Sequence, residues 1–359
     1  MNQGGTAKWL TTLESGLHNK GIENSIAAGC VQMGEVEDQN FAQIRSIRLK
    51  HLGRAVSPLK DLKALFELRS LIKAYRPDLV NTHTSKAGTL GRIAVSTILR
   101  NKPTIIHTYQ GHLLYGYFKP WKVYLVVRVE KFLAKFTQVL IVSGEKVKNE
   151  LIEAGIGKPA QYIILNPGID TPKFISRVEA RTILGIETNS FVIGWLGRIT
   201  RIKRPELFLD LAKRNPKFIF LMGGDGEMLN EIKNQSPRNL LTVGWSNPEL
   251  IWGASDIAIL TSENEAQPIS LVEAGSAGLP LIAFNVGSIN GVIANDENGY
   301  LVTTIDEMSQ AINSLYDSGV IREKFGAAGK HKMMTEFGVE GFINSHVNVY
   351  KESIKNLSK

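Results

Sequence analysis

Short apolar runs alternate with longer amphipathic stretches along almost the whole of this chain. Such alternation is typical of parallel α/β units, in which each strand is followed by a helix that packs on the sheet. The alternation breaks at residues 166–170, Asn-Pro-Gly-Ile-Asp, a turn-forming segment, and then begins again. We therefore expect two α/β domains, residues 1–168 and residues 169–340.

The individual elements follow from the same pattern. In the first half it predicts strands over 24–31, 44–49, 78–83, 103–108 and 138–143, and helices over 5–20, 58–74, 86–100, 119–136 and 144–154. In the second half it predicts strands near 190–196, 217–222, 239–243, 256–261 and 280–284, with helices between them. From about residue 305 the pattern is helical to the end. The fold class is therefore two Rossmann-like domains that face each other across a cleft.

The first domain lacks an element at its start. A doubly wound domain begins with its central strand, and a glycine turn follows that strand. Here Gly4 and Gly5 come after only three residues, so the sequence does not contain this first strand. Either the coding start lies upstream, which we favour, or the domain folds without a central strand.

Composition narrows the class of protein. Hydrophobic residues make up 43% of the chain and charged residues 21%, the balance of a soluble globular protein. No apolar run approaches the roughly 18–20 residues that span a bilayer, and the first residues do not resemble a signal peptide. The single Cys30 excludes an internal disulfide. We expect a cytoplasmic protein.

Positive charge is concentrated in the first half. Residues 1–168 contain 23 Lys and Arg against 12 Asp and Glu, a net charge of +11, whereas the remainder has 19 against 22, or −3. This imbalance favours an anionic partner, and a basic surface without a partner is the alternative. Residues 115–135 mix aromatic, aliphatic and cationic side chains, which suits a helix on anionic lipid as well as a core helix. No nucleic-acid-binding module is recognisable.

Two carboxylates flank a predicted helix start in the second half. Glu265 and Glu273 stand eight residues apart around Pro268. A helix N-terminus presents unpaired N–H groups that can hold a diphosphate, and both glutamates can accept hydrogen bonds from sugar hydroxyls. A helix with ordinary capping acids is the alternative.

Two further loops follow predicted strands. Arg198 and Lys203 flank a turn at the end of one strand, where two cations can neutralise the phosphates of a leaving nucleotide. Asp225 and Gly226 belong to a glycine turn after the next strand, which can approach a nucleotide closely. Taken singly, each is also compatible with an ordinary exposed loop.

In their order and spacing these segments resemble the retaining glycosyltransferases of family 4, the group 1 glycosyltransferases with GT-B architecture. Glu265 and Glu273 match the paired glutamates of that family, and Arg198 and Lys203 match its conserved cations. The turn at residues 224–227 matches as well. The resemblance covers nearly the whole chain. It implies transfer of a sugar from a nucleotide diphosphate, with retention of anomeric configuration and without a metal or other cofactor.

The resemblance also implies roles for single residues. In such enzymes the matches to Arg198 and Lys203 bind the diphosphate, and the match to Glu273 holds the ribose hydroxyls. Glu265 is expected to contact the transferred sugar. The other residues that match donor-binding positions are Ile269, Ser270, Asp225, Gly226, Gly4 and Gly5.

On the acceptor side the chain departs from the family pattern. Gln110 stands where the family commonly has a histidine that faces the reacting sugar, and an amide cannot take up a proton near neutral pH. His112 matches a second histidine and is expected to share this role. Ala266 replaces a common glycine. The candidate catalytic residues are therefore Glu265, Gln110 and His112.

Together these features predict a cytoplasmic hexosyltransferase. We expect the nucleotide sugar to bind residues 169–340 and a glycan or lipid-linked acceptor to bind residues 1–168, with residues 341–359 returning as a helix to the first domain. An anionic membrane surface is a further expected partner, in the assembly of a cell-surface polysaccharide or glycolipid. A non-catalytic nucleotide-sugar-binding protein, and an epimerase or phosphorylase on the same scaffold, are the alternatives.

Overall fold

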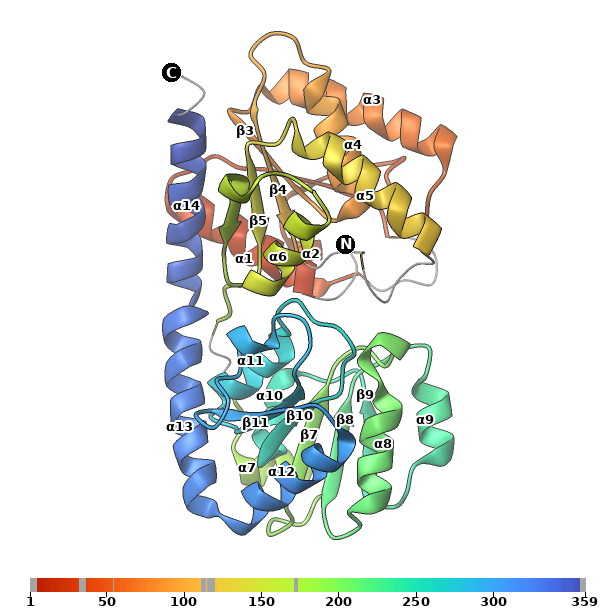
Figure 1. Cartoon of the computed structure of the whole chain (residues 1–359), viewed down its shortest axis with the longest axis vertical. Helices are drawn as coiled ribbons and strands as arrows, with labels where there is room; N and C mark the ends of the chain where they lie inside the picture. Colours follow the sequence, from red (N-terminus) through yellow and green to blue (C-terminus); the bar gives the residue numbers. More distant parts are fainter. Residues whose placement is uncertain are drawn as a thin grey trace. The chain divides into compact units, whose positions relative to one another are not determined.

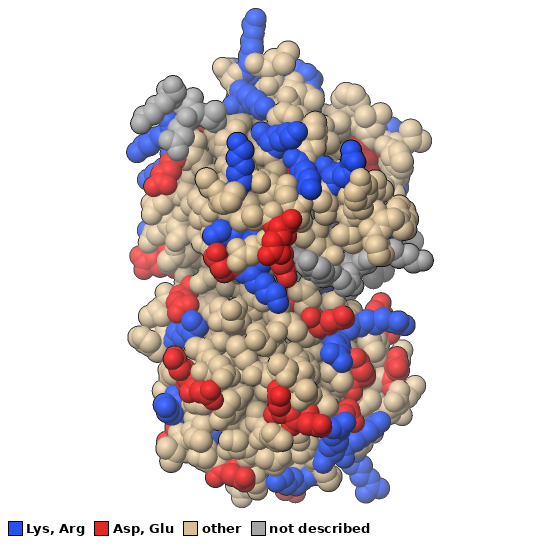
Figure 2. Space-filling view, viewed as in Figure 1, with Lys and Arg blue, Asp and Glu red and all other residues tan. Residues whose placement is uncertain are grey.

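The computed structural model describes residues 5–31, 37–53, 55–110, 114, 120–170 and 174–355. The chain folds into two compact units (Figure 1): unit 1 comprises Met1–Gly168 together with Val339–Lys359, and unit 2 comprises Ile169–Gly338. In both units parallel strands alternate with helices, so the predicted α/β class is confirmed. Lys and Arg are more prominent than Asp and Glu on the face of unit 1 that Figure 2 shows.

Unit 2 is built on one parallel sheet with the strand order β12-β11-β10-β7-β8-β9. Its strands are β7 (Val192–Leu196), β8 (Ile219–Gly223), β9 (Leu240–Gly244), β10 (Ile257–Leu260), β11 (Leu281–Phe284) and β12 (Gly299–Val302). Its α-helices are α7 (Arg177–Leu184), α8 (Pro205–Arg214), α9 (Leu229–Gln235), α10 (Pro248–Ala254), α11 (Ile269–Ser276), α12 (Ile305–Asp317) and α13 (Gly319–Glu336). The chain moves outward from β7 to β9 and then returns to the other side of β7 as β10. The topological switch point therefore lies between β7 and β10.

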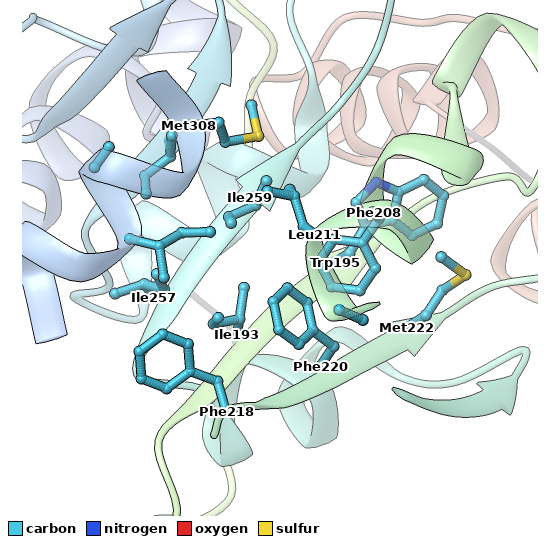
Figure 3. Close-up of a cluster of buried hydrophobic side chains, with 14 of the residues drawn as sticks. Ile193, Trp195, Phe208, Leu211, Phe218, Phe220, Met222, Ile257, Ile259 and Met308 are labelled. Carbon is cyan, nitrogen blue, oxygen red and sulfur yellow. The ribbon is translucent and has the colours of Figure 1, made fainter. Parts of the chain in front are cut away.

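Both faces of the unit 2 sheet carry a hydrophobic core. Successive residues of a strand point to opposite faces, so Ile193 and Trp195 of β7 enter one core and Val192 enters the other. Figure 3 shows the first core, in which Phe208 of α8 packs near Trp195 with ring centroids 6.3 Å apart. Each large side chain that is buried in this way contributes about 1.5–3 kcal/mol. These cores hold the strand ends, and the loops that follow them, in fixed positions.

Unit 1 contains two parallel sheets. β1 (Ile26–Gly29) pairs with β2 (Ser46–Leu49), and a separate sheet has the order β3-β4-β5-β6. The strands of the second sheet are β3 (Leu79–His83), β4 (Thr104–Tyr109), β5 (Val139–Val142) and β6 (Tyr162–Ile164). The α-helices of unit 1 are α1 (Gly5–Asn19), α2 (Gln39–Gln43), α3 (Pro58–Tyr75), α4 (Ser85–Ser96), α5 (Pro120–Ala134), α6 (Glu145–Glu153) and α14 (Val339–Lys355).

The C-terminal helix α14 belongs to unit 1, although it follows the last helix of unit 2 in sequence. Trp9 of α1 meets Phe342 edge to face with ring centroids 5.0 Å apart, and it lies 5.6 Å from the ring of His346. The side-chain amide of Asn81 in β3 donates to the Tyr350 hydroxyl over 2.7 Å. Helix α14 therefore packs on α1 and on the four-stranded sheet.

Two short strands and one short α-helix are absent from the sequence-based prediction: β6, β12 and α2. They are 3, 4 and 5 residues long. Over so few residues a period of 3.6 or 2 cannot be distinguished from chance. The longer elements lie within a few residues of their predicted bounds.

Candidate functional site

The predicted donor residues of the second half gather at the carboxyl edge of the unit 2 sheet. They lie on the loops after β7, β8 and β10 and on α11, which follows the last of these loops. Ligands of open parallel sheets bind at this edge, next to the switch point. The strand order alone therefore places these residues where ligands of such sheets bind.

Backbone contacts join the loops after β7 and β8. The N–H of Ile199 donates to the carbonyl of Asp225 over 2.8 Å. Gly224 and Gly226 have φ of +136° and +156°, and a Cβ on them would lie 1.9 Å from the Gly197 oxygen and 2.4 Å from the Ile199 oxygen. Only glycine fits at these two positions, because any side chain would separate the loops.

A buried ion pair joins the loops after β7 and β10. The ammonium group of Lys203 contacts Oε1 of Glu265, and the hydroxyl of Ser262 donates to the same oxygen over 2.6 Å. Only 18% of the Lys203 side chain and 9% of the Glu265 side chain are exposed. Because both charges are largely removed from water, each holds the other in place.

A second chain of hydrogen bonds fixes the backbone of Lys203. The indole N–H of Trp195 in β7 donates to the hydroxyl of Thr261 over 3.1 Å, and this hydroxyl donates to the Lys203 carbonyl over 2.8 Å. The N–H of Glu263 also donates to the Ile202 carbonyl over 2.9 Å. Sequence reasoning missed Thr261, whose partners Trp195 and Lys203 lie 66 and 58 residues away along the chain.

The turn after β11 supports Glu265 from another side. The N–H of Ser288 donates to the Glu265 carbonyl over 2.9 Å. Gly287 has φ of +56°, and a Cβ on it would lie 1.7 Å from the Glu265 oxygen. This position requires glycine for both its backbone conformation and the close approach.

Helix α11 starts beside these loops. Pro268 is its N-cap and Ile269 its first helical residue, so the helix begins one residue after the start predicted at Pro268. The N–H groups of Leu271 and Val272 donate to the Pro268 carbonyl. Those of Ile269 and Ser270 make no hydrogen bond within the described part of the chain. Two unpaired donors at the positive end of a helix can bind an anion.

The remaining donor candidates differ in exposure. Arg198 and Asp225 are exposed, and Asp225 Oδ1 accepts the N–H of Gly226 over 2.7 Å. Glu273 is buried within α11, with 4% of its surface exposed. Gly5 is exposed at the first residue of α1, and Gly4 lies outside the described residues.

On the acceptor side, Gln110 follows β4 and lies next to the end of β3. Its Nε2 is 3.4 Å from Nδ1 of His83, and its Oε1 is buried without a hydrogen-bond partner in the parts of the chain that the structure describes. Burial, and to a lesser degree the nearby His346, lowers the pKa of His83 to about 3. His83 is therefore neutral near pH 7. His112 lies outside the described residues.

A buried polar network connects α4, α5 and β4. Nη2 of Arg92 donates to both carboxylate oxygens of Glu130 over 2.8 Å, and the Tyr109 hydroxyl donates to Oε2 over 2.6 Å. Local periodicity cannot reveal a pair that is 38 residues apart on two helices. The network therefore holds the inner face of α5 against α4 and β4.

Among the residues that the structure describes, no group of three or more His, Cys, Asp or Glu side chains could hold a metal ion. Within the same part of the chain, no helix is both long and apolar enough to cross a bilayer.

Two parallel α/β units, one with arginine, lysine and two glutamates at its switch point, define the class as glycosyltransferases with the GT-B fold. The chain belongs to the group 1 glycosyltransferases of family 4. Residues 176–332 match the family described as "Glycosyl transferases group 1", and residues 3–173 match "Glycosyltransferase Family 4".

Named relatives agree with this assignment. The UDP-Gal:alpha-D-GlcNAc-diphosphoundecaprenol alpha-1,3-galactosyltransferase of Escherichia coli is 31% identical over 348 residues, covering 91% of this chain and 89% of that protein. The capsular polysaccharide biosynthesis glycosyltransferase CapM of Staphylococcus aureus is 25% identical over 324 residues, covering 84% of each.

Solved structures show the same architecture. Alr3699/HepE from Anabaena, in complex with UDP, has a TM-score of 0.80 at 18% identity and covers 97% of this chain and 96% of its own. Sucrose-phosphate synthase from Thermosynechococcus elongatus has a TM-score of 0.82 at 18% identity, covering 97% and 93%. These likenesses establish the GT-B fold.

Proposed function

We propose that this chain transfers a hexose from a nucleoside diphosphate sugar to a lipid-linked glycan, with retention of anomeric configuration and without a metal ion. The observation that carries the proposal is the cluster of Arg198, Lys203, Glu265 and the α11 N-terminus at the switch point of unit 2. Residues 169–340 then form the donor side and residues 1–168 the acceptor side, with residues 341–359 packed on the latter.

The cations and the helix start are suited to a leaving diphosphate. When the bond to the sugar breaks, negative charge grows on the phosphate oxygens. The Arg198 guanidinium, the Lys203 ammonium and the α11 N–H groups stabilise this charge. They supply what a bound metal ion would otherwise contribute, which is our reason to propose metal-independent transfer.

The two glutamates bind the parts of the donor on either side of its diphosphate. Glu273 accepts from the ribose hydroxyls and Glu265 from a hydroxyl of the transferred sugar. A donor that engages Lys203 also weakens its contact with Glu265, while the hydrogen bond from Ser262 keeps this carboxylate in position. Asp225 and Gly226 border the nucleotide.

Relatives and sequence support the acceptor side of the proposal. The Escherichia coli relative acts, by its name, from UDP-Gal on a GlcNAc linked to diphosphoundecaprenol. We propose a UDP-sugar and a lipid-linked diphosphate acceptor of this chemical class, in the assembly of a cell-surface polysaccharide. Gln110 and His112 contact the reacting sugar from unit 1, and Gly4 and Gly5 border the donor phosphates.

The outer face of α5 fits a membrane surface where such an acceptor is held. Trp121, Tyr124, Leu125 and Phe132 recur at helical spacing and are each more than half exposed. Exposed cations lie between them: Lys122, Arg128 and Lys131. The single acid of the helix, Glu130, points inward to Arg92. An apolar and cationic face without acids binds anionic lipid, so we propose peripheral association with the cytoplasmic side of the membrane.

Thermal unfolding with nucleotides tests the donor site. UDP, GDP and their sugar conjugates are added to the wild type, to Arg198→Ala and to the control Arg201→Ala, an exposed arginine on the same loop. A ligand at 100 times its Kd adds about 2.7 kcal/mol, a clear shift in Tm. We expect a shift with one nucleotide family that Arg198→Ala loses and Arg201→Ala keeps. No shift with any nucleotide in the folded wild type would contradict the proposal.

Vesicle sedimentation tests the membrane face. We expect the protein to bind phosphatidylglycerol vesicles and not phosphatidylcholine vesicles, and Trp121→Ser to weaken this binding several-fold. Trp245→Ser in unit 2 is the matched control, because Trp245 is 57% exposed and Trp121 is 59% exposed. Equal losses for both variants would rule out α5 as the contact surface.

A further inference from the structure

Helices α3, α4 and α5 form one layer of unit 1, in which α4 contacts both of the others (Figure 1). The first halves of α3 and α4 meet in one cluster, which contains Ala64 and Ala87. Their second halves meet in another cluster, which contains Ile72 and Ala94 together with Ile105 of β4. The two helices therefore run in the same direction. Because α4 follows β3 directly, both begin at the end of the layer where β3 ends.

The outer side of α3 carries a row of large apolar side chains. Leu59, Leu62 and Phe66 are spaced by three and four residues, so they share one stripe of the helix. They are 78%, 51% and 62% exposed, whereas Ala64 and Ile72 on the inner side are buried. A continuous row of exposed apolar side chains marks an interaction surface. Helix α3 therefore has an outer face that unit 1 itself leaves uncovered.

The charges of this helix layer are sorted. The acids of α3, α4 and α5 all contact a basic side chain of unit 1: Asp61 contacts Lys86, Glu67 contacts His51 and Glu130 contacts Arg92. Lys60 and Lys63 of α3 are exposed beside the apolar stripe. Within the described residues, the outer side of the layer thus presents apolar and cationic groups and no acid without a partner.

We propose that α3 is a second lipid-contacting helix of unit 1, separate from α5. Leu59, Leu62 and Phe66 enter the headgroup region of an anionic bilayer, and Lys60 and Lys63 contact lipid phosphates. An apolar stripe flanked by lysines is typical of helices that lie in a membrane interface, and anionic headgroups attract such lysines. A second copy of the chain fits less well, because a symmetric contact would set the lysines of the two copies against each other.

Two contacts fix an orientation that one contact leaves free. Packed helices lie about 8–10 Å apart, so α3 and α5, with α4 between them, meet lipid along two lines roughly 20 Å apart. A unit held by one helix can roll about that helix, and a unit held by two cannot. The stripe occupies the first half of α3, at the end of the layer where β3 ends in His83. The contact therefore holds the acceptor side towards the lipid, a consequence that rests on the proposed function.

Binding to phosphatidylglycerol vesicles tests the second contact. Phe66→Ser is compared with Tyr75→Ser, since Phe66 and Tyr75 belong to the same helix and are 62% and 59% exposed. Tyr75 lies about 180° around the helix from Phe66, away from the stripe. We expect Phe66→Ser to raise the Kd for the vesicles about 3- to 10-fold and Tyr75→Ser to leave it unchanged. Equal effects of the two substitutions would overturn the proposal.

A double variant separates α3 from the membrane face of α5. Independent contacts add in free energy, so we expect Phe66→Ser combined with Trp121→Ser to weaken vesicle binding by the product of the two single losses. Binding that Trp121→Ser weakens and Phe66→Ser leaves unchanged would overturn the role of α3 alone. Absence of binding by the wild type would contradict the proposed membrane association itself. A dimer in lipid-free solution that Phe66→Ser dissociates, as seen by sedimentation velocity, would also overturn the proposal, because a second copy would then cover the stripe.

Discussion

Residues that carry no catalytic chemistry help to hold Glu265 in position. Ser262 donates to its carboxylate, and the turn at Gly287 and Ser288 lies against its carbonyl. Lys203 completes the arrangement with a counter-charge. A donor therefore meets a carboxylate whose orientation is set before binding, which lowers the entropy cost of recognition.

Removal of the Ser262 hydroxyl tests this positioning. Ser262→Ala leaves Glu265 buried with one hydrogen bond fewer, a loss of about 1–2 kcal/mol. We expect the apparent KM for the donor sugar to rise roughly 5–30-fold, as measured by steady-state transfer. Ser276→Ala is the control, since the Ser276 hydroxyl is also buried but donates only to the Val272 carbonyl. Equal effects of the two variants would show that Ser262 does not position the site.

Alanine substitutions at Gly287 and Gly244 distinguish the effect of steric overlap on stability from the effect of backbone strain. Both have positive φ, +56° and +70°, but a Cβ on Gly244 meets nothing within 4 Å. Gly244→Ala therefore bears only the left-handed backbone strain of about 1–2 kcal/mol. Gly287→Ala also drives a methyl group into the Glu265 carbonyl. We expect it to lower Tm further and to abolish the nucleotide shift, and equal Tm values for both variants would contradict this.

At the level of elements, the contact between α14 and α1 encloses a histidine. Burial lowers the pKa of His346 from an ordinary value near 6.5 to about 4. Between these values the unfolded chain binds a proton that the folded chain does not, so the free energy of unfolding falls as pH falls below 6.5. The loss from this group amounts to about 1.4 kcal/mol per pH unit at most.

Urea unfolding at pH 7 and pH 5 measures this effect. We expect the wild type to lose stability at pH 5 and His346→Gln, which has no group that titrates there, to lose less. An identical pH dependence of the two proteins would show that His346 is not the group responsible.

The ion pair between Arg92 of α4 and Glu130 of α5 is a second contact between helices that affects stability. Glu130→Gln removes the counter-charge of Arg92, which is fully buried. We expect a loss of about 3–5 kcal/mol in the free energy of unfolding, as for other buried pairs that lose one partner. Glu145→Gln on α6 is the control, because Glu145 is 60% exposed in its pair with Lys148 and exposed pairs contribute about 0–1 kcal/mol. Equal losses would contradict the account of the network.

At the scale of the whole molecule, the fold can be predicted from the sequence more completely than the contacts of the site can. Strong periodicity locates the long helices and strands, and the order of the motifs identifies the loops around Arg198 and Glu265. It cannot show that Lys203 and Glu265 touch, or that Thr261 holds the backbone of Lys203, because these contacts arise only when distant loops meet.

Sugar transfer is the most direct test of the account. The full chain is incubated with UDP-galactose, a GlcNAc-diphospholipid acceptor and EDTA, and the lipid product is analysed by mass spectrometry and anomeric NMR, beside Lys203→Ala and Arg201→Ala. We expect an acceptor extended by one hexose in an α-linkage, lost with Lys203→Ala and kept with Arg201→Ala. Donor binding without transfer to any lipid-linked glycan, or release of free sugar whether or not acceptor is present, would contradict the assignment.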